Sequence, residues 1–111
     1  MSSPQTQGLQ IVPAASEDFR RLLLRLEGEL DSSTGALLRA WLRKLDRQPL
    51  VLDLGGLTFT DSSGLAILLE ERTRSLQNGA PLRIRGATGQ TRDLLKRAGV
   101  LELLGDPSRV H

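Results

Sequence analysis

Hydrophobic and polar positions follow two periods along the chain, and each change of period marks a new element. Leu9 and Ile11 flank a polar residue and predict a first strand. Pro13 places that strand at a sheet edge, since proline has no N–H to donate to a ladder. Between residues 22 and 30, apolar positions alternate with mostly charged ones, which predicts a second strand. We expect these two strands to form an antiparallel hairpin.

A helix and a buried strand follow the hairpin. Asp31-Ser32-Ser33-Thr34 offers candidate N-caps, because short polar side chains accept hydrogen bonds from the free amides of a first helical turn. Helical spacing then carries the apolar positions Leu37, Leu38, Trp41, Leu42 and Leu45. Leu50 to Leu54 is a nearly continuous apolar run, as is typical of central parallel strands covered on both faces. Gly55-Gly56 breaks this pattern and predicts the end of that strand.

The same two periods continue in the second half of the chain. Asp61 or Ser62 is the predicted N-cap of a second helix. Asn78-Gly79 closes that helix with residues that tolerate a left-handed backbone. Leu82 and Ile84 alternate with arginines and predict a fourth strand.

A third helix comes last and completes an α/β order. Thr88 is its predicted cap and Gly99 its predicted end, while Val100 to Leu104 is either a final strand or an apolar tail packed on the sheet. The order β-β-α-β-α-β-α, with room for one more β, predicts a single-domain mixed sheet covered by helices. We expect a short flexible N-terminus over 1–8, the domain over 9–105 and a tail over 106–111.

Composition restricts the classes of function. The 111 residues suit one domain, and the absence of cysteine excludes disulfides, thiolate nucleophiles and Cys-ligated zinc. The N-terminus lacks the pattern of a secretory signal, and the apolar stretch Gly64 to Leu69 is too short to cross a bilayer, so we expect a cytoplasmic protein without membrane contact. The formal charge is only +2, and acidic residues are interspersed with the basic ones. Trp41, Phe59 and Phe19 lie in apolar patterns that predict core positions.

The chain offers little for catalysis. His111 is the only histidine and the last residue, a poor place to hold a catalytic hydrogen bond. No cluster has metal-ligand spacing, and Gly55-Gly56 lacks the further residues of a nucleotide-binding loop. Asp53 and Asp61 are better explained as a strand residue and an N-cap than as an acid–base pair. We therefore expect no enzyme, no catalytic residue, no metal and no cofactor.

The segment Asp61-Ser62-Ser63-Gly64 remains as a candidate site. Asp61 or Ser62 is needed to cap the helix, which leaves the hydroxyl of Ser63 free to face outward from the first or second helical position. Gly64 has no side chain, so another backbone could approach closely. The segment follows a central strand, where open α/β sheets often place their sites. An exposed hydroxyl at this place is a good contact and a good phosphate acceptor.

These residues resemble a known family. The stretch from Leu52 to Leu65, which reads Leu-Asp-Leu-Gly-Gly-Leu-Thr-Phe-Thr-Asp-Ser-Ser-Gly-Leu, is similar to the signature of STAS domains, in particular bacterial anti-sigma factor antagonists. Gly28-Glu29-Leu30-Asp31 matches the other marker of that family. The resemblance runs from about Leu9 to Leu104 and agrees with the predicted order of elements. Ala66 departs from it, since the family often has glycine there.

The resemblance implies partner switching. In such antagonists the second serine of the motif, here Ser63, is phosphorylated by a partner that is both anti-sigma factor and Ser kinase. The unmodified form binds that partner and frees the sigma factor; the phosphorylated form is released, and a Ser/Thr phosphatase restores it. The kinase brings the ATP, and the chain is expected to be a monomer or weak dimer. The implied partner-binding loop consists of Asp31, Phe59, Thr60, Asp61, Ser62, Ser63, Gly64 and Leu65.

Two alternatives stay open. STAS domains also serve as non-catalytic scaffold subunits in stress-signalling assemblies and as partners of transporter ATPases. A nucleic-acid binder would need the arginines of the first and third helices, Arg39, Arg43, Arg92 and Arg97, on one face. Interleaved charges favour solvated helix faces instead, so we expect no direct contact with nucleic acid.

Overall fold

Seven elements make up the part of the chain that the computed structural model describes, residues 8–16, 21–45 and 47–101. They are β1 (Leu9–Ala14), β2 (Leu22–Leu30), α1 (Gly35–Lys44), β3 (Leu50–Thr60), α2 (Ser62–Gln77), β4 (Leu82–Arg85) and α3 (Gly89–Arg97). This is the predicted order. Val100 and Leu101 lie in no strand, while residues 102–104, the rest of the possible last strand, fall outside the described residues.

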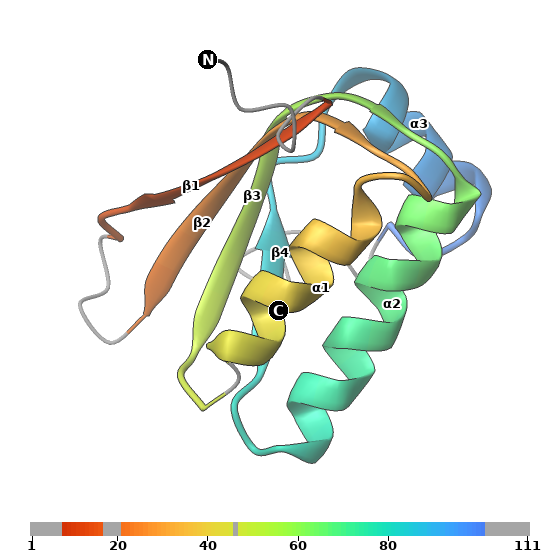
Figure 1. Cartoon of the computed structure of the whole chain (residues 1–111). Coiled ribbons are helices and arrows are strands. Elements are labelled where there is room, and N and C mark those ends of the chain that lie inside the picture. Colours follow the sequence, from red (N-terminus) through yellow and green to blue (C-terminus); the bar gives the residue numbers. More distant parts are fainter. Residues whose placement is uncertain (1–7, 17–20, 46, 102–111) are drawn as a thin grey trace, which may run out of the picture.

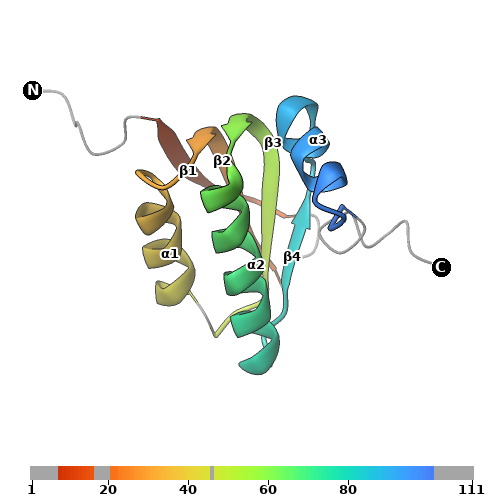
Figure 2. The same cartoon turned by 90° about the vertical axis from the view of Figure 1, so that its right-hand side faces the viewer.

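The four strands form one mixed sheet in the order β1-β2-β3-β4. β1 pairs antiparallel with β2, which confirms the hairpin and the edge position of Pro13. β2, β3 and β4 run parallel, joined by crossovers through α1 and α2. Both of these helices cover the same face of the sheet, and α3 packs against β3 (Figures 1 and 2). The predicted α/β class is confirmed.

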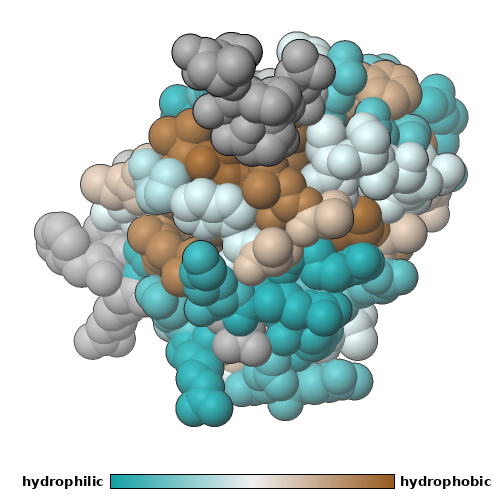
Figure 3. All heavy atoms as spheres, in the orientation of Figure 1, coloured by the Kyte–Doolittle hydropathy of each residue, from teal (hydrophilic) through white to brown (hydrophobic). Residues whose placement is uncertain are grey.

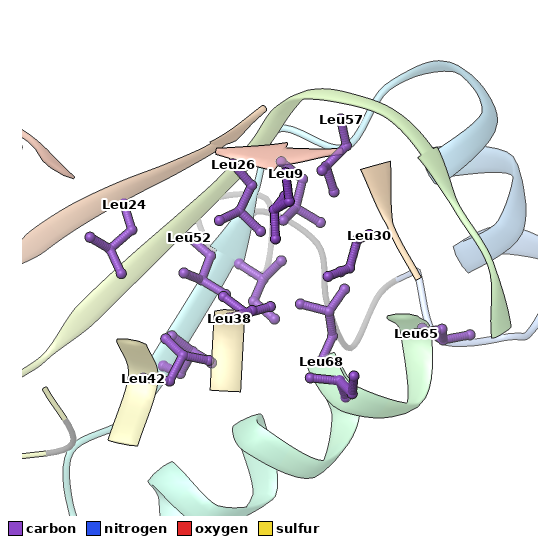
Figure 4. Packing of buried hydrophobic residues seen from close by; sticks show 14 of the residues in the cluster. Leu9, Leu24, Leu26, Leu30, Leu38, Leu42, Leu52, Leu57, Leu65 and Leu68 are labelled. Atoms are coloured by element: carbon purple, nitrogen blue, oxygen red, sulfur yellow. The ribbon is translucent and has the colours of Figure 1, made fainter. Parts of the chain in front are cut away.

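Leucines fill the layer between the sheet and its helices. Leu24 and Leu26 of β2 and Leu52 of β3 are fully buried, as are Leu38 of α1 and Leu68 of α2 (Figure 4). Full burial of such a side chain contributes about 1.5–3 kcal/mol. The period of two in β2 and the helical spacing in α1 and α2 therefore have one cause, because both patterns place leucine side chains in this layer.

The predicted end of the third strand at Gly55-Gly56 is wrong, since β3 continues to Thr60. The pairing of β2 with β3 shifts register between Arg25 and Glu27, where the backbones come close. A Cβ at Gly56 would lie 2.7 Å from the carbonyl oxygen of Leu26, so the glycine permits the approach of the two strands. Glycine here marks an irregular ladder rather than a turn.

The prediction of a core position for Phe59 is also wrong, because 41% of this residue is exposed. A second register shift, between Gly28 and Glu29, changes which residues point inward at the end of the ladder. Thr60 is fully buried in consequence, and Phe59 pairs with the exposed Glu29. The strand extension thus carries an aromatic side chain to the surface just before the candidate site.

Candidate functional site

The candidate site lies where β2 and β3 end side by side. Leu30 pairs with Thr60 in the parallel ladder, and the amide of Asp61 donates to the carbonyl of Leu30 at 3.3 Å. Each strand leads into its helix through the same tripeptide, Asp-Ser-Ser. We call residues 31–34 loop 1 and residues 61–64 loop 2. Both views place the two loops at the same corner of the molecule (Figures 1 and 2).

Loop 2 leaves two hydroxyls unused. Asp61 has an extended backbone and caps α2, with its carboxylate accepting from the amide of Gly64 at 2.9 Å. Ser62 and Ser63 therefore occupy the first two helical positions, and both are exposed. Within the described residues neither hydroxyl has a hydrogen-bond partner. The predicted cap and the outward-facing Ser63 agree with this geometry.

Gly64 and Leu65 lie beneath the surface that they were expected to line. Both are buried, and a Cβ on Gly64 would lie 2.4 Å from the carbonyl oxygen of Leu30. The backbone that approaches this glycine closely thus belongs to the end of β2 in the same chain. The position of these two residues gives them a supporting role: they hold the first turn of α2 against β2 and bring loop 2 next to loop 1.

Thr60 is held from the other side by α3. The side-chain amide of Gln90 accepts from the Thr60 amide at 2.8 Å and donates to the Thr60 carbonyl at 2.8 Å. The hydroxyls of Thr60 and Thr91 lie 2.8 Å apart in a buried contact. The sequence pattern did not single out Gln90 or Thr91. Nothing local signals this pairing, because it joins the end of β3 to the first turn of a distant helix.

Loop 1 uses its aspartate differently. The carboxylate of Asp31 accepts from the Ser33 hydroxyl at 2.7 Å and from the amides of Ser33 and Thr34 at 3.0 and 3.1 Å. The Ser33 hydroxyl is the main cause that lowers the pKa of Asp31 below its ordinary value, and the two amides add to it. The Thr34 hydroxyl donates to the carbonyl of Glu29 at 2.9 Å. Loop 1 is therefore a closed turn with an ionised carboxylate inside it.

The site surface combines an aromatic ring with exposed hydroxyls. We call Phe59, Ser32, Ser33, Ser62 and Ser63 the corner surface; all five are exposed. Small, weakly polar residues dominate this corner, whereas strongly hydrophilic residues gather lower down over α1 and α2 (Figure 3). Such a surface offers one apolar side chain and four hydroxyl groups that can form hydrogen bonds or be modified.

The arginines of the nucleic-acid alternative do not form one face. Arg39 pairs with Glu70 at 2.7 Å, and Arg43 pairs with the buried Glu71 at 3.3 Å, so both cations of α1 are matched by α2. Helix α3, which contains Arg92 and Arg97, lies on the opposite side of α2 from α1 (Figure 2). The structure thus opposes the continuous basic stripe that this alternative required.

The two carboxylates that were considered for an acid–base pair make separate contacts. Asp53 accepts from the Gly55 amide at 2.8 Å and faces Arg85 at 3.9 Å, in the middle of β3, whereas Asp61 caps α2. Across residues 8–16, 21–45 and 47–101 no group of His, Cys, Asp and Glu is placed to hold a metal ion. His111 lies outside the described residues. No helix in the described part has the length and apolarity for a bilayer crossing.

A family model matches most of the chain. Its description is "Mlab, STAS domain", and the match covers residues 14–105. This range includes both loops, all of the parallel strands and the three helices.

Solved structures share the fold at low sequence identity. An anti-sigma factor antagonist from Mycobacterium paratuberculosis has a TM-score of 0.75 and 22% identity, over 96% of this chain and 91% of that one. The antagonist SpoIIAA in its unphosphorylated form has a TM-score of 0.67 and 23% identity, over 88% and 85%. A part of the murine anion transporter Slc26a9 has a TM-score of 0.66 and 19% identity, over 79% of this chain and 15% of the transporter.

Proposed function

This chain belongs to the STAS domain family, and on that premise we propose that it is an anti-sigma factor antagonist controlled by phosphorylation of Ser63. The unmodified chain binds an anti-sigma factor that is also a Ser kinase, and a sigma factor is thereby released. Phosphorylation of Ser63 ends the binding, and a Ser/Thr phosphatase reverses it. The chain itself is a cytoplasmic regulator without catalytic activity.

The observation that carries this proposal is the state of the Ser63 hydroxyl. It is exposed, it stands on the first turn of α2, and no described residue engages it. Asp61 takes over the capping, so transfer of a phosphoryl group to Ser63 breaks no hydrogen bond of the fold. The exposed ring of Phe59, two residues before Asp61, offers the apolar anchor for the partner.

Elementary electrostatics explains how one phosphate would act as a switch. A phosphoserine adds about −1.5 to −2 charges near neutral pH. The amides at the start of α2 favour that charge by roughly 0.3–1 kcal/mol, so the fold tolerates it. In a protein contact, however, the dianion must lose its water, and this desolvation opposes binding. Phosphorylation is thus expected to weaken the complex without unfolding the domain.

The test is the affinity of Ser63 variants for the partner of this proposal, an anti-sigma factor with Ser kinase activity. Ser63→Ala should bind that kinase as the unmodified chain does. Ser63→Glu should bind about tenfold more weakly or worse, equivalent to about 1.4 kcal/mol. Ser63→Gln, of nearly the same shape but uncharged, is the matched control and should bind more tightly than the Glu variant. Equal affinities of the Ala and Glu variants would refute the switch.

A second candidate is a scaffold subunit of a stress-signalling or transporter complex. The likeness to a part of an anion transporter favours it. Such a subunit would copurify in a stable complex with equal yield for Ser63→Ala and Ser63→Glu. The exposed and unengaged Ser63 favours the first candidate, because a scaffold does not need an accessible acceptor.

A further inference from the structure

We propose that Ser32 in loop 1 is a second phosphorylation site of this protein. The inference rests on the proposed function and extends it, since the same kinase would modify both loops of the corner surface. One exposed hydroxyl in each loop would then carry a phosphate.

The first observation is the repetition of the acceptor segment. Asp31-Ser32-Ser33 and Asp61-Ser62-Ser63 stand at the same position, directly after neighbouring parallel strands. The register aligns Leu30 with Thr60, the residues that precede the two aspartates. A kinase that modifies Ser63 therefore meets a similar segment at the end of β2. By position the counterpart of Ser63 is Ser33, but the hydroxyl of Ser33 is engaged by Asp31, which leaves the preceding Ser32 as the free hydroxyl.

The second observation is the proximity of the two loops. The amide of Asp61 donates to the carbonyl of Leu30, and Gly64 packs on that same carbonyl so tightly that no side chain would fit. The first turn of α2 is thus pressed against Leu30, the residue that directly precedes loop 1. Loop 1 and loop 2 lie at the same corner of the molecule, so an enzyme that approaches loop 2 also meets loop 1 (Figure 1).

The hydrogen bonds of loop 1 select Ser32 among its three hydroxyls. Thr34 is buried and donates to the carbonyl of Glu29, so its hydroxyl is out of reach. Ser33 donates to Asp31 at 2.7 Å, and a phosphate there would break this bond and face an ionised carboxylate. The Ser32 hydroxyl is exposed and makes no hydrogen bond within the described part of the chain.

The closed turn also presents Ser32 in one orientation. The carbonyl of Asp31 accepts from the amide of Gly35 at 2.8 Å, which closes the turn and leaves Ser32 and Ser33 at its tip. An acceptor that is already ordered loses less conformational entropy when the enzyme binds it. Loop 1 therefore combines a free hydroxyl with a fixed backbone, as the first turn of α2 does for Ser63.

The chemical step is a phosphoryl transfer from ATP. The Ser32 Oγ forms a bond to the γ-phosphorus, the bond from that phosphorus to the β–γ bridging oxygen breaks, and ADP leaves. The hydroxyl proton passes to a base of the kinase. Each phosphate adds about −1.5 to −2 charges, so a second one on the adjacent loop deepens the repulsion of the partner. The switch would then have two steps, with the doubly modified form binding most weakly.

Phosphopeptide mapping tests the inference on the full chain. The chain is incubated with ATP and the partner kinase of the proposed function, and then digested with trypsin. The two loops fall in separate peptides, residues 26–39 and 48–72, because Arg25, Arg39, Arg47 and Arg72 are the flanking cleavage sites. We expect phosphate on both peptides, with fragmentation placing it on Ser32 in the first. Ser32→Ala should remove it there, and the matched control Ser33→Ala should keep it.

The outcomes separate the two proposals. Phosphate on 48–72 alone overturns the inference and leaves the Ser63 switch standing. Phosphate on Ser32 without any on Ser63 supports the inference and overturns the Ser63 switch. Phosphate in 26–39 on Ser33 or Thr34, in place of Ser32, overturns the inference, and an unmodified chain overturns both proposals. Thermal melting of Ser32→Ala and Ser33→Ala verifies that both variants are folded.

Discussion

Loop 1 and loop 2 share the tripeptide Asp-Ser-Ser and follow paired strands, yet their aspartates make different hydrogen bonds. Asp61 takes an extended backbone and accepts from one amide of α2. Asp31 folds a turn around its carboxylate and binds the hydroxyl of Ser33. The following residue differs: Gly64 lets helix α2 begin at once against β2, while Thr34 keeps its side chain for the β2 backbone. Identical short sequences thus take their conformation from packing.

The largest expected effect comes from disturbing the close contact between Gly64 and β2, a contact that loop 1 does not have. Gly64→Ala places a methyl 2.4 Å from the carbonyl oxygen of Leu30, and the backbone there has little room to yield. We expect a loss of about 1–3 kcal/mol in the free energy of unfolding. The better helix propensity of alanine returns at most about 1 kcal/mol. Urea unfolding measures the difference.

The matched control for Gly64→Ala is Ser63→Ala in the preceding helical position. Ser63 is exposed and unengaged in the described residues, so its variant should stay within about 0.5 kcal/mol of the parent chain. A Gly64→Ala protein as stable as Ser63→Ala would show that loop 2 does not depend on contact with β2.

The next effect concerns Thr60, the residue before Asp61. The residue before Asp31 in loop 1 is a buried leucine, so loop 1 has no equivalent of this threonine. Gln90→Ala removes both side-chain hydrogen bonds to the Thr60 backbone and leaves that amide and carbonyl unpaired. We expect a cost of about 1–3 kcal/mol in urea unfolding. Gln90→Glu keeps the acceptor and loses the donor, so it should fall between the parent chain and Gln90→Ala. Equal stability of all three proteins would show that the hydrogen bonds between Gln90 and the Thr60 backbone do not stabilise the fold.

A smaller effect is expected for Asp61, whose carboxylate caps α2, whereas the carboxylate of Asp31 stabilises a turn. Asp61→Ala removes the cap of α2 and should lower the free energy of unfolding by about 0.5–2 kcal/mol. Asp61→Asn preserves an acceptor oxygen and should recover most of this loss, as followed by thermal melting. If Asn is no better than Ala, the oxygen of Asp61 is not the relevant group.

The smallest expected effect is a pH dependence that belongs to loop 1. The hydrogen bonds from Ser33 and Thr34 lower the pKa of Asp31 in the folded state from its ordinary value of 3.8. The carboxylate therefore contributes stability above pH 3.8, and this contribution is lost as the pH falls through the lowered pKa. The melting temperature of the parent chain should exceed that of Asp31→Asn near neutral pH and approach it in acid.

The control for this pH effect removes its main cause. In a Ser33→Ala background the hydroxyl that lowers the pKa of Asp31 most is gone, so the difference from Asp31→Asn should shrink. A pH dependence that persists unchanged in that background would assign the effect to another group.

The sequence was sufficient for the elements and for the cap of the second helix. The alternation from residue 22 to residue 30 and the helical spacing after Gly35 both led to the observed elements, because these periods reflect a buried face within one segment. Asp61 was one of the two predicted caps, with Ser62, because capping preference depends on the adjacent amides alone. The exposure of Ser63 follows from the same local geometry.

The sequence was insufficient where two segments meet. The shifts in the β2–β3 register extended β3 through Gly55-Gly56 and turned Phe59 outward, and no pattern within β3 contains that information. The two hydrogen bonds between the Gln90 side chain and the Thr60 backbone depend on where α3 packs. The two Asp-Ser-Ser segments are visible in the sequence. Only the pairing of Leu30 with Thr60 shows that they lie next to each other in the folded chain.

The sequence by itself determined the α/β order of elements, a helix cap at Asp61 or Ser62 and the resemblance to STAS domains. Each of these depends on neighbours along the chain, whose spacing the covalent backbone sets. Tertiary structure alone decided that the two loops share one corner, that Gly64 is a packing position and that Phe59 reaches solvent. Those features depend on strand register and on the close approach of backbones distant in sequence, which form only when the whole sheet assembles.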